Sequence, residues 1–149
     1  MRKYLKRVVD SDCKLLYEWA NEKLVRANSF NSIKIDFEEH KIWFKNKLVS
    51  INSYMFIFYI NKEPVGQVRL EKVGKIGIIN YSLDKNHRGK GLSLDMIKLL
   101  NDEVNINHIK IKALVGYVKM ENEASQKIFE RLHYNKLIEN NNFKYYKYI

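Results

Sequence analysis

The chain has 149 residues, of which 46% are hydrophobic and 30% are charged, so it holds enough apolar material for one domain with a buried core and too much for intrinsic disorder. Its 27 Lys and Arg residues outnumber 17 Asp and Glu residues, for a formal net charge of +10, which suits nucleic acid, an anionic membrane or a small polyanionic ligand. The single cysteine, Cys13, excludes an intramolecular disulfide and a cysteine-built zinc site.

We expect a cytoplasmic protein that does not contact a membrane. Charged side chains at Arg2, Lys3, Lys6 and Arg7 stand where a signal peptide would need its apolar stretch. The longest apolar run, 54–60, is too short to cross a bilayer. Most of the basic residues are lysines, whereas arginine leads the recognition of nucleic-acid bases. We therefore expect no nucleic-acid partner.

The first third of the chain predicts a strand and two helices. Residues 3–9 alternate as a strand does, and residues 13–21 place apolar side chains on one helical face. Residues 26–34 are polar and predicted to be irregular. Asp36 and Glu39 form a capping-box-like start to a second helix. The apolar stripe of that helix is Phe37, Ile42, Trp43 and Leu48.

The rest of the chain predicts a sheet with helices packed on it. No flexible linker and no internal repeat divides the sequence, so residues 1–149 form one domain. The order of elements indicates an α/β or α+β class protein with a mixed sheet. The predicted strands are 54–60, 64–71, 75–83, 108–116, 134–138 and 143–149, and the predicted helices are 89–104 and 122–132.

A glycine-rich turn follows the strand predicted at 75–83 and precedes a helix. Gly89 and Gly91 let the backbone approach a ligand closely, because they carry no Cβ. The unpaired amides at the start of the helix, at the positive end of its dipole, can hold phosphate oxygens. Arg88 and Lys90 are expected to add positive charge there. Neither a Walker-type loop nor a dinucleotide-binding fingerprint is present, so the turn predicts a different kind of diphosphate site.

A second segment, 118–134, predicts a helix capped by Asn122 with Ser125 in its first turn. Arg-Gly-Lys-Gly-Leu after a strand, followed about thirty residues later by Asn-x-x-Ser-x-x-x-aromatic-Glu-Arg-Leu-x-aromatic, resembles the GNAT superfamily of acyl-CoA-dependent N-acetyltransferases. The order of elements is similar over the whole chain.

The resemblance implies a mixed, mainly antiparallel sheet of about seven strands with about four helices, splayed between the fourth and fifth strands. It implies a single N-acetyltransferase domain over residues 1–149, with acetyl-CoA as cosubstrate. Backbone amides of residues 88–93 would hold the CoA pyrophosphate, and the backbone near Leu83 would contact pantetheine. The cofactor-binding residues implied in this way are Leu83, Arg88, Gly89, Lys90, Gly91, Leu92, Ser93, Asn122 and Ser125.

Two positions depart from the family pattern. Many members have a tyrosine general acid where this chain has Phe129, which cannot protonate a thiolate. His133 replaces a glycine and must end its helix with backbone strain. Tyr81 and Ser82, at the end of a strand, could relay a proton through water, and Tyr134 is the nearest substitute acid in the sequence. These three residues are the catalytic candidates.

The acceptor is predicted to bind near residues 26–43. The combination Arg…Ser-Phe-Asn-Ser, followed by Glu-Glu-His-x-x-Trp-Phe, is similar to that of a GNAT branch that acetylates amino groups of nucleotide-linked sugars. An arginine can pair a diphosphate, amides and hydroxyls suit sugar hydroxyls, and aromatic rings can stack on a base. The predicted acceptor-binding residues are Arg26, Asn28, Ser29, His40 and Trp43. The alternative for His40 and Trp43 is a surface residue and a core residue, respectively.

Three other functions fit the sequence. A related GNAT branch acetylates protein amino termini, including those of ribosomal proteins. A non-catalytic acyl-CoA sensor would account for Phe129, and an RNA-binding domain could use the aromatic and basic run 143–148, which a closing edge strand explains equally well. No ligand spacing for a metal occurs. The expected partner is a small-molecule amine, and a homodimer is compatible with the sequence.

Overall fold

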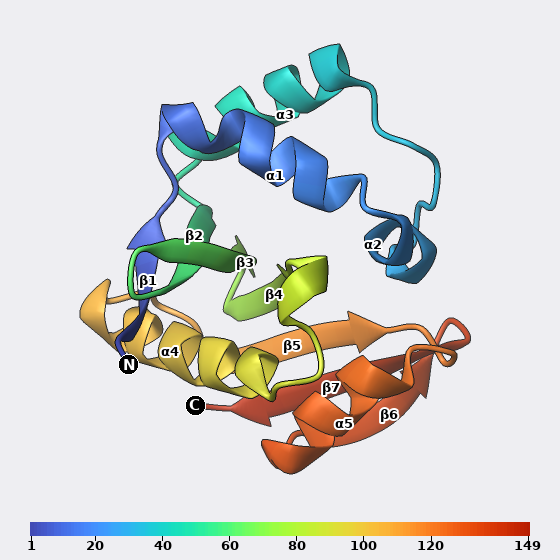
Figure 1. Cartoon of the computed structure of the whole chain (residues 1–149). Helices are drawn as coiled ribbons and strands as arrows, with labels where there is room; N and C mark the ends of the chain where they lie inside the picture. The colour runs from blue at the N-terminus through green and yellow to red at the C-terminus, as the bar shows by residue number, and fades with distance from the viewer.

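One mixed sheet of seven strands organises the computed structural model, which describes residues 1–149 (Figure 1). The strands follow the order β1-β2-β3-β4-β5-β7-β6 across the sheet. They span Lys3–Arg7 (β1), Ser53–Ile60 (β2), Glu63–Val73 (β3), Ile76–Leu83 (β4), Ala113–Val118 (β5), Asn135–Glu139 (β6) and Asn142–Tyr148 (β7). The helices span Cys13–Ala20 (α1), Lys23–Asn28 (α2), Phe37–Val49 (α3), Leu92–Ile106 (α4) and Glu123–Arg131 (α5), with short 3-10 turns at Asp10–Asp12 and Lys85–His87.

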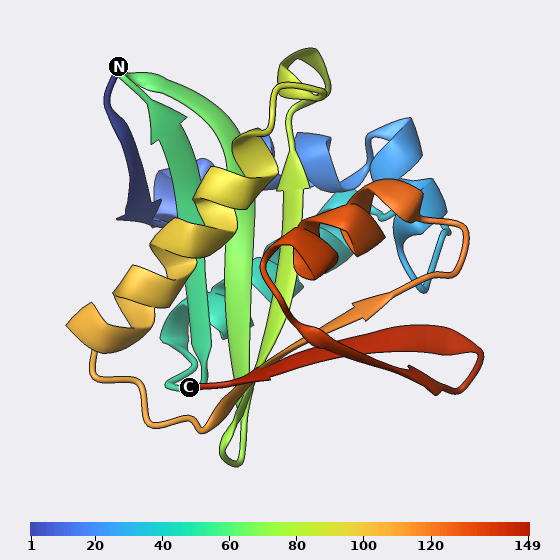
Figure 2. The same cartoon turned by 90° about the horizontal axis from the view of Figure 1, so that it is seen from below.

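The fourth and fifth strands meet at one end only. They are the one parallel pair, joined through α4, and all other neighbours in the sheet are antiparallel. Their pairing runs from Ile76 opposite Ala113 to Ile78 opposite Val115, and then stops. Figure 2 shows the two strands diverging beyond that point. The predicted mixed, mainly antiparallel sheet with a splay between strands 4 and 5 is confirmed.

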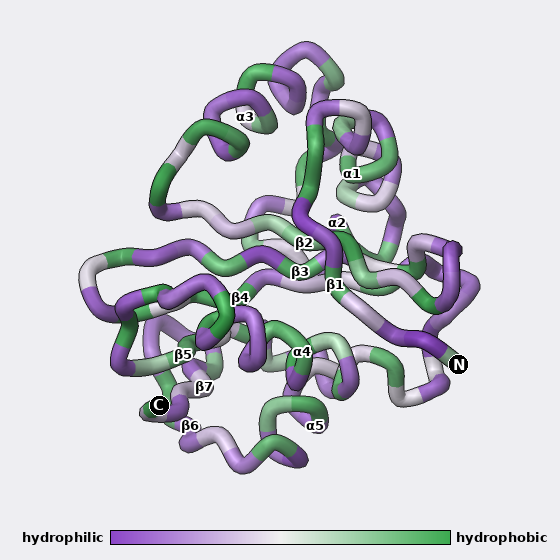
Figure 3. The backbone as a smooth tube through the Cα atoms, turned by 90° about the vertical axis from the view of Figure 1, so that its left-hand side faces the viewer, coloured by the Kyte–Doolittle hydropathy of each residue, from purple (hydrophilic) through white to green (hydrophobic).

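The central strands bury side chains on both faces of the sheet. Successive side chains of a strand point to opposite faces, and helices cover each face. Met55 and Ile57 of β2 pack against α1 and α3, whereas Phe56 and Phe58 of the same strand belong to a larger core. Helices α4 and α5 contribute to that larger core on the opposite face. The helices carry both hydrophobic and hydrophilic stretches along the backbone tube, as expected where one side of a helix packs on the sheet (Figure 3). No helix is both long and apolar enough to cross a membrane.

Two expectations for residues 26–49 need correction: the irregular segment at its start and the apolar stripe of the helix that follows. Residues 26–28 are the last turn of α2, which Glu22 caps by accepting a hydrogen bond from the amide of Leu24 at 2.8 Å. Sequence periodicity misses so short a helix. Asp36 caps α3 as predicted, accepting from the amide of Glu39 at 3.2 Å. Ile42 of the predicted apolar stripe is 65% exposed, and Phe44 is buried in its place.

The carboxyl-terminal part differs from the prediction in two places. The strand expected over 108–116 begins only at residue 113, because His108 adopts a positive φ of 50° after α4. The strand over 142–148 is not an edge strand, since β7 lies between β5 and β6. The strain predicted at His133 is confirmed, because its φ is 62° where α5 ends.

Candidate active site

A cavity of about 830 Å³ lies where β4 and β5 diverge. Helices α1 to α3 supply its wall on one face of the sheet, and α4 and α5 supply its wall on the other. All of the predicted site residues line this cavity except Lys90 and Tyr134. We call the part bounded by α4 and α5 the donor half, and the part bounded by α2 and α3 the acceptor half.

The predicted glycine turn leads into α4 at the donor half. Gly89 and Gly91 have φ values of 79° and 73°, the left-handed region that disfavours a side chain. Nothing lies within 4 Å of where a Cβ would stand at either glycine. None of the backbone hydrogen bonds outside the regular elements is donated by residues 88–94. The first amides of α4 also lack partners inside the helix, so the turn has free donors and open space for an anion.

The positive charge expected from Arg88 is used inside the protein. Its guanidinium forms an ion pair with Glu22 at 2.6 Å and donates a hydrogen bond to the carbonyl of Leu83 at 3.2 Å. The hydrogen bond from Arg88 lowers the pKa of Glu22. Arg88 therefore fastens the turn to the start of α2, which corrects the prediction that it offers a free charge. Lys90 is exposed and stands outside the cavity lining.

Asp84 connects the start of the glycine turn to α1. Its carboxylate accepts hydrogen bonds from the amide of Asn86 at 2.9 Å and from the indole Nε1 of Trp19 at 3.0 Å. Burial alone would raise the pKa of Asp84, but these two donors together with His87 lower it. The turn is thus tied to α1 through a carboxylate that stays ionised. Preorganised donors are what an anion site needs.

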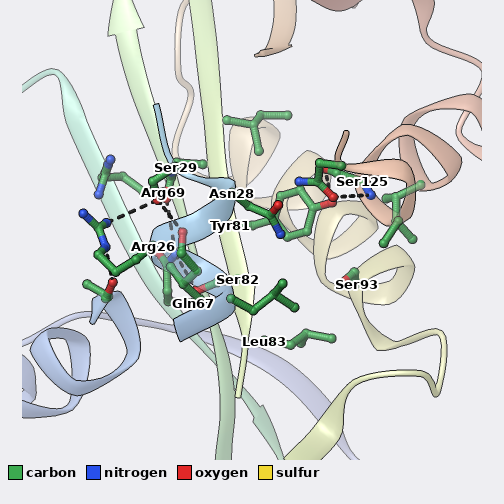
Figure 4. Close-up of a pocket in the computed structure, with 18 of the residues that line it drawn as sticks. Arg26, Asn28, Ser29, Gln67, Arg69, Tyr81, Ser82, Leu83, Ser93 and Ser125 are labelled. Atoms are coloured by element: carbon green, nitrogen blue, oxygen red, sulfur yellow. Dashed lines mark hydrogen bonds between the residues drawn. The ribbon is translucent and has the colours of Figure 1, made fainter. Parts of the chain in front are cut away.

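Tyr81 and Ser125 face each other across the donor half (Figure 4). The phenol oxygen of Tyr81 lies 2.6 Å from Ser125 Oγ, and either atom can be the donor. Burial raises the pKa of Tyr81 to about 12, although the hydrogen bond with Ser125 acts in the opposite direction. Asn122 caps α5 by accepting from the amide of Ser125 at 3.2 Å, as its sequence position predicts. Tyr81 is therefore a neutral O–H group in the cavity.

Tyr134, the third catalytic candidate, does not reach the cavity. Its ring packs edge-on against Phe129 with centroids 5.0 Å apart, and it is 9% exposed. Burial raises the pKa of Tyr134. It lies three residues after the end of α5, and its amide donates a hydrogen bond to the carbonyl of Phe129 at 3.0 Å. The structure therefore places the Tyr134 ring in the core and outside the cavity lining, where the predicted proton donor would have to act.

Polar side chains of two central strands form the floor of the acceptor half. Gln67 donates hydrogen bonds to Ser82 Oγ at 3.1 Å and to Asn80 Oδ1 at 3.3 Å. Arg69 follows on the same strand face. Gln67, Arg69 and Asn80 were not predicted as site residues, because polar positions on an alternating strand indicate solvent. The missed signal is that the two strands carrying them are central, with both faces covered.

Arg26 acts as a clamp rather than as a free cation. It donates hydrogen bonds to the carbonyls of Ala20 at 2.6 Å, Asn31 at 2.9 Å and Ile33 at 3.2 Å, and to Ser29 Oγ at 3.2 Å. These bonds fold the segment between α2 and α3 over the acceptor half. Four of its five N–H donors are thus used within the protein, so Arg26 is not the free cation that the predicted contact with a diphosphate needs.

His40 is also a structural residue. It is 3% exposed, and its Nε2 donates a hydrogen bond to the carbonyl of Cys13 at 3.0 Å. Its ring packs against Tyr17, Trp43 and Phe44 between α1 and α3. Neither the predicted stacking on a base nor the alternative of a surface residue is correct. Trp43 is half-buried and reaches the cavity, where the guanidinium of Arg69 lies 4.9 Å from its ring centroid.

The burial of His40 predicts a pH dependence of stability. Burial lowers the pKa of His40, while the hydrogen bond to Cys13 opposes the shift. The unfolded chain therefore takes up a proton that the folded chain refuses, and the free energy of unfolding falls as the pH drops below about 6.5. In His40→Phe this loss is expected to be smaller. Urea unfolding of both proteins at about pH 7 and about pH 5 measures the difference, and equal losses would contradict the assignment.

The arrangement defines a class of protein. Free amides that can hold an anion face a polar acceptor half through a gap in the sheet, so the cavity can hold a phosphorylated ligand beside a second, polar one. Residues 2–135 match the acetyltransferase (GNAT) domain family, and the chain belongs to that family. The chain is therefore an acetyltransferase of the GNAT family. No protein with a curated description matches the sequence closely.

Three solved structures show how widely this fold is shared. A domain from Methanocaldococcus jannaschii DSM 2661 is 20% identical, with a TM-score of 0.85 over 99% of both chains. Spermidine N-acetyltransferase from Vibrio cholerae, solved with CoA and spermine, is 14% identical, with a TM-score of 0.86 over 98% of this chain and 95% of that chain. RimL, a ribosomal L7/L12 α-N-protein acetyltransferase solved with CoA, is 16% identical, with a TM-score of 0.81 over 97% of this chain and 93% of that chain.

Proposed function

We propose that the protein acetylates a primary amine of a nucleotide-linked amino sugar, and that it does so in the cytoplasm. The observation that carries the acceptor proposal is the chemistry of the acceptor half. Its lining is rich in neutral amides and hydroxyls, including Asn28, Ser29, Gln67 and Asn80. Among all residues that line the cavity, Glu39 is the one carboxylate. Such a lining suits a molecule with many hydroxyls. A polycation such as spermine would need carboxylates instead.

The donor half fits CoA. The open space at Gly89 and Gly91 is a cradle that Cβ atoms would fill, and the amides that follow have no partner in the protein. We assign the pyrophosphate to these amides, through residues 88–93, and the pantetheine to the strand end near Leu83, where the pairing of β4 and β5 has ended. Acetyl-CoA supplies the acetyl thioester. The protein supplies alignment and hydrogen bonds.

Tyr81 and Ser125 are the groups that we assign to the leaving sulfur. Full proton transfer from a phenol with a pKa of about 12 to a thiolate is uphill by about 5 kcal/mol, because the corresponding thiol has a pKa of about 8.5. The phenol is therefore better suited to donate a hydrogen bond than to release its proton. Donation from Ser125 to Tyr81 would leave the phenol O–H free for that purpose. Ser82, held by Gln67 on the acceptor side, can pass the proton of the amine to water.

Thermal unfolding with acetyl-CoA and with CoA tests the donor half. Saturable binding must raise the melting temperature, so no rise at millimolar ligand would overturn the proposal. Thiol release with a panel of acceptors then tests the acceptor half. We expect turnover with nucleotide-linked amino sugars rather than with free sugars, spermine or amino-terminal peptides. Turnover with peptides alone would favour the protein amino-terminal branch, and CoA binding without any turnover would favour a sensor.

The glycine turn yields a prediction with a matched control. Gly91→Val is expected to weaken CoA binding about tenfold, because a side chain is strained at positive φ and a Cβ would occupy the space assigned to phosphate. Gly74→Val carries the same strain, since Gly74 has a φ of 61° and open surroundings. Gly74 lies between β3 and β4, outside the cavity lining. Calorimetric titration with CoA should show weaker binding for the first variant only, and equal affinities would contradict the assignment.

A further inference from the structure

Arg69 differs from the other arginines that line the cavity near α2, because its side chain makes no hydrogen bond in the protein and has one ion-pair partner, Glu71. Arg26 is occupied by three carbonyls and a hydroxyl, and Arg88 by Glu22 and Leu83. Arg69 makes no hydrogen bond, and its buried Nε has no partner. Only Glu71 approaches it, with Oε1 at 3.2 Å from that Nε. The donors on its two terminal nitrogens make no hydrogen bond to the protein, and the side chain lines the cavity, so these donors are the ones that a ligand could use.

The charges around Arg69 do not balance. Glu71 is shared between Arg69 and Lys47, whose Nζ lies 2.9 Å from the same Oε1. Ser53 also donates a hydrogen bond to the other oxygen of Glu71 at 2.7 Å. One carboxylate therefore serves two cations and leaves one positive charge over. Burial lowers the pKa of Arg69 and Glu71 opposes this, but an arginine stays protonated.

The guanidinium is held in a fixed orientation. It lies over the ring of Trp43, with 4.9 Å between Cζ and the ring centroid, and its Nε edge is directed at Glu71. A planar guanidinium fixed in this way is suited to bidentate binding of a carboxylate or phosphate. Gln67 lies beside it on the same face of the sheet (Figure 4), and Asn80 is its cross-strand partner on β4. The result is a prepared anion subsite on the acceptor side.

We propose that Arg69 is a specificity residue that binds an anionic group of the acceptor, a phosphate or a carboxylate, while the amine points toward the gap between β4 and β5. The inference rests on the proposed function and names the feature of the acceptor that the site selects. The positive charge of Arg69 also repels polyamines and aminoglycosides, which are cations themselves, and so disfavours them as acceptors.

Binding to the CoA-saturated protein tests this subsite, because the donor half is then filled. The probes are UDP, the dipeptide Ser-Ala, and Ser-Ala amide, each titrated calorimetrically into the wild type, Arg69→Gln and Lys47→Gln. Lys47→Gln leaves Glu71 to Arg69 alone, while Arg69 itself stays in the cavity lining, so it tests whether the spare positive charge matters. Arg69→Lys keeps the charge and guards against a folding defect in Arg69→Gln.

We expect at least one anion to bind about tenfold more weakly to Arg69→Gln than to the wild type, with Arg69→Lys and Lys47→Gln in between. Dependence on Arg69 for UDP identifies a phosphate. Dependence for Ser-Ala but not for its amide identifies a carboxylate. The proposed subsite is refuted if neither anion binds the wild type, or if both anions bind Arg69→Gln as tightly as they bind the wild type. Because these readouts need no turnover, a protein that binds UDP through Arg69 but acetylates nothing would refute the proposed function alone.

Discussion

Tyr81→Phe is expected to lower kcat by about a hundredfold, the usual cost of removing one preorganised donor that acts on developing charge. The substitution deletes the O–H that we assign to the leaving sulfur and keeps the ring in place. Binding of acetyl-CoA should be almost unchanged, because the turn at Gly89 and Gly91 is untouched. Thiol release at saturating acceptor measures kcat, and thermal shift with acetyl-CoA measures binding.

Tyr134→Phe is the matched control for this prediction. It removes the same hydroxyl from a tyrosine that lies outside the cavity lining, so kcat should stay within about twofold of the wild type. Equal losses in the two variants would remove Tyr81 from the mechanism. Since the pKa of Tyr81 is raised to about 12, no fall in kcat from ionisation of the phenol is expected up to about pH 10.

Ser125→Ala separates two roles of the hydroxyl pair. If Ser125 donates to Tyr81, its removal leaves the phenol proton in place but loosens the orientation of the ring. The expected fall in kcat is then smaller, about tenfold. A fall as large as that of Tyr81→Phe would instead indicate that the two groups act as one unit.

The features that could be predicted from the sequence are local ones. Two glycines between a strand and a helix identify the anion turn, because few other residues adopt the φ values seen at Gly89 and Gly91. Asp36 and Asn122 mark helix starts for the same kind of reason, since a cap depends on residues two or three positions away. Strand alternation places β2 to β4 within two residues of their bounds.

The features that could not be predicted depend on partners distant in the sequence. Arg88 loses its free charge to Glu22, 66 positions away. His40 is buried because α1 packs on α3 and presents the carbonyl of Cys13 to it. Arg69 gains its importance from Trp43, 26 positions away, and from α3, which covers that face of the sheet, whereas Glu71 is a local partner on the same strand. A polar residue on a strand gives no local sign of which partners it will meet.

Gly116→Ala is expected to give the largest loss of stability among the variants considered. Gly116 lies on β5, and a Cβ there would come within 2.4 Å of Cζ of Phe129 and 2.9 Å of both Cε atoms. The ring cannot easily move away, because it stacks on Tyr145 at 5.2 Å and meets Tyr134 at 5.0 Å. Overpacking of this kind costs about 1–3 kcal/mol, and a chain of this size should melt roughly 3–10 °C lower.

Gly77→Ala is the matched control within the same sheet. Its Cβ would approach Ile111 Cδ1 and Leu70 Cδ1, each at 2.8 Å, which are the ends of flexible side chains that can rotate away. The same added methyl group should therefore cost less. If Gly77→Ala is as destabilising as Gly116→Ala, the aromatic cluster is not what makes Gly116 necessary.

A double-mutant cycle assigns the effect to the ring itself. In Phe129→Leu the aromatic ring that faces Gly116 is gone, so adding Ala at 116 should cost less in that background than in the wild type. The difference between the two costs, measured from urea unfolding midpoints at constant slope, is the coupling free energy. A coupling near zero would mean that Phe129 does not demand glycine on β5. A clear coupling would show that the ring of Phe129 is a packing element that requires glycine at the facing position of β5.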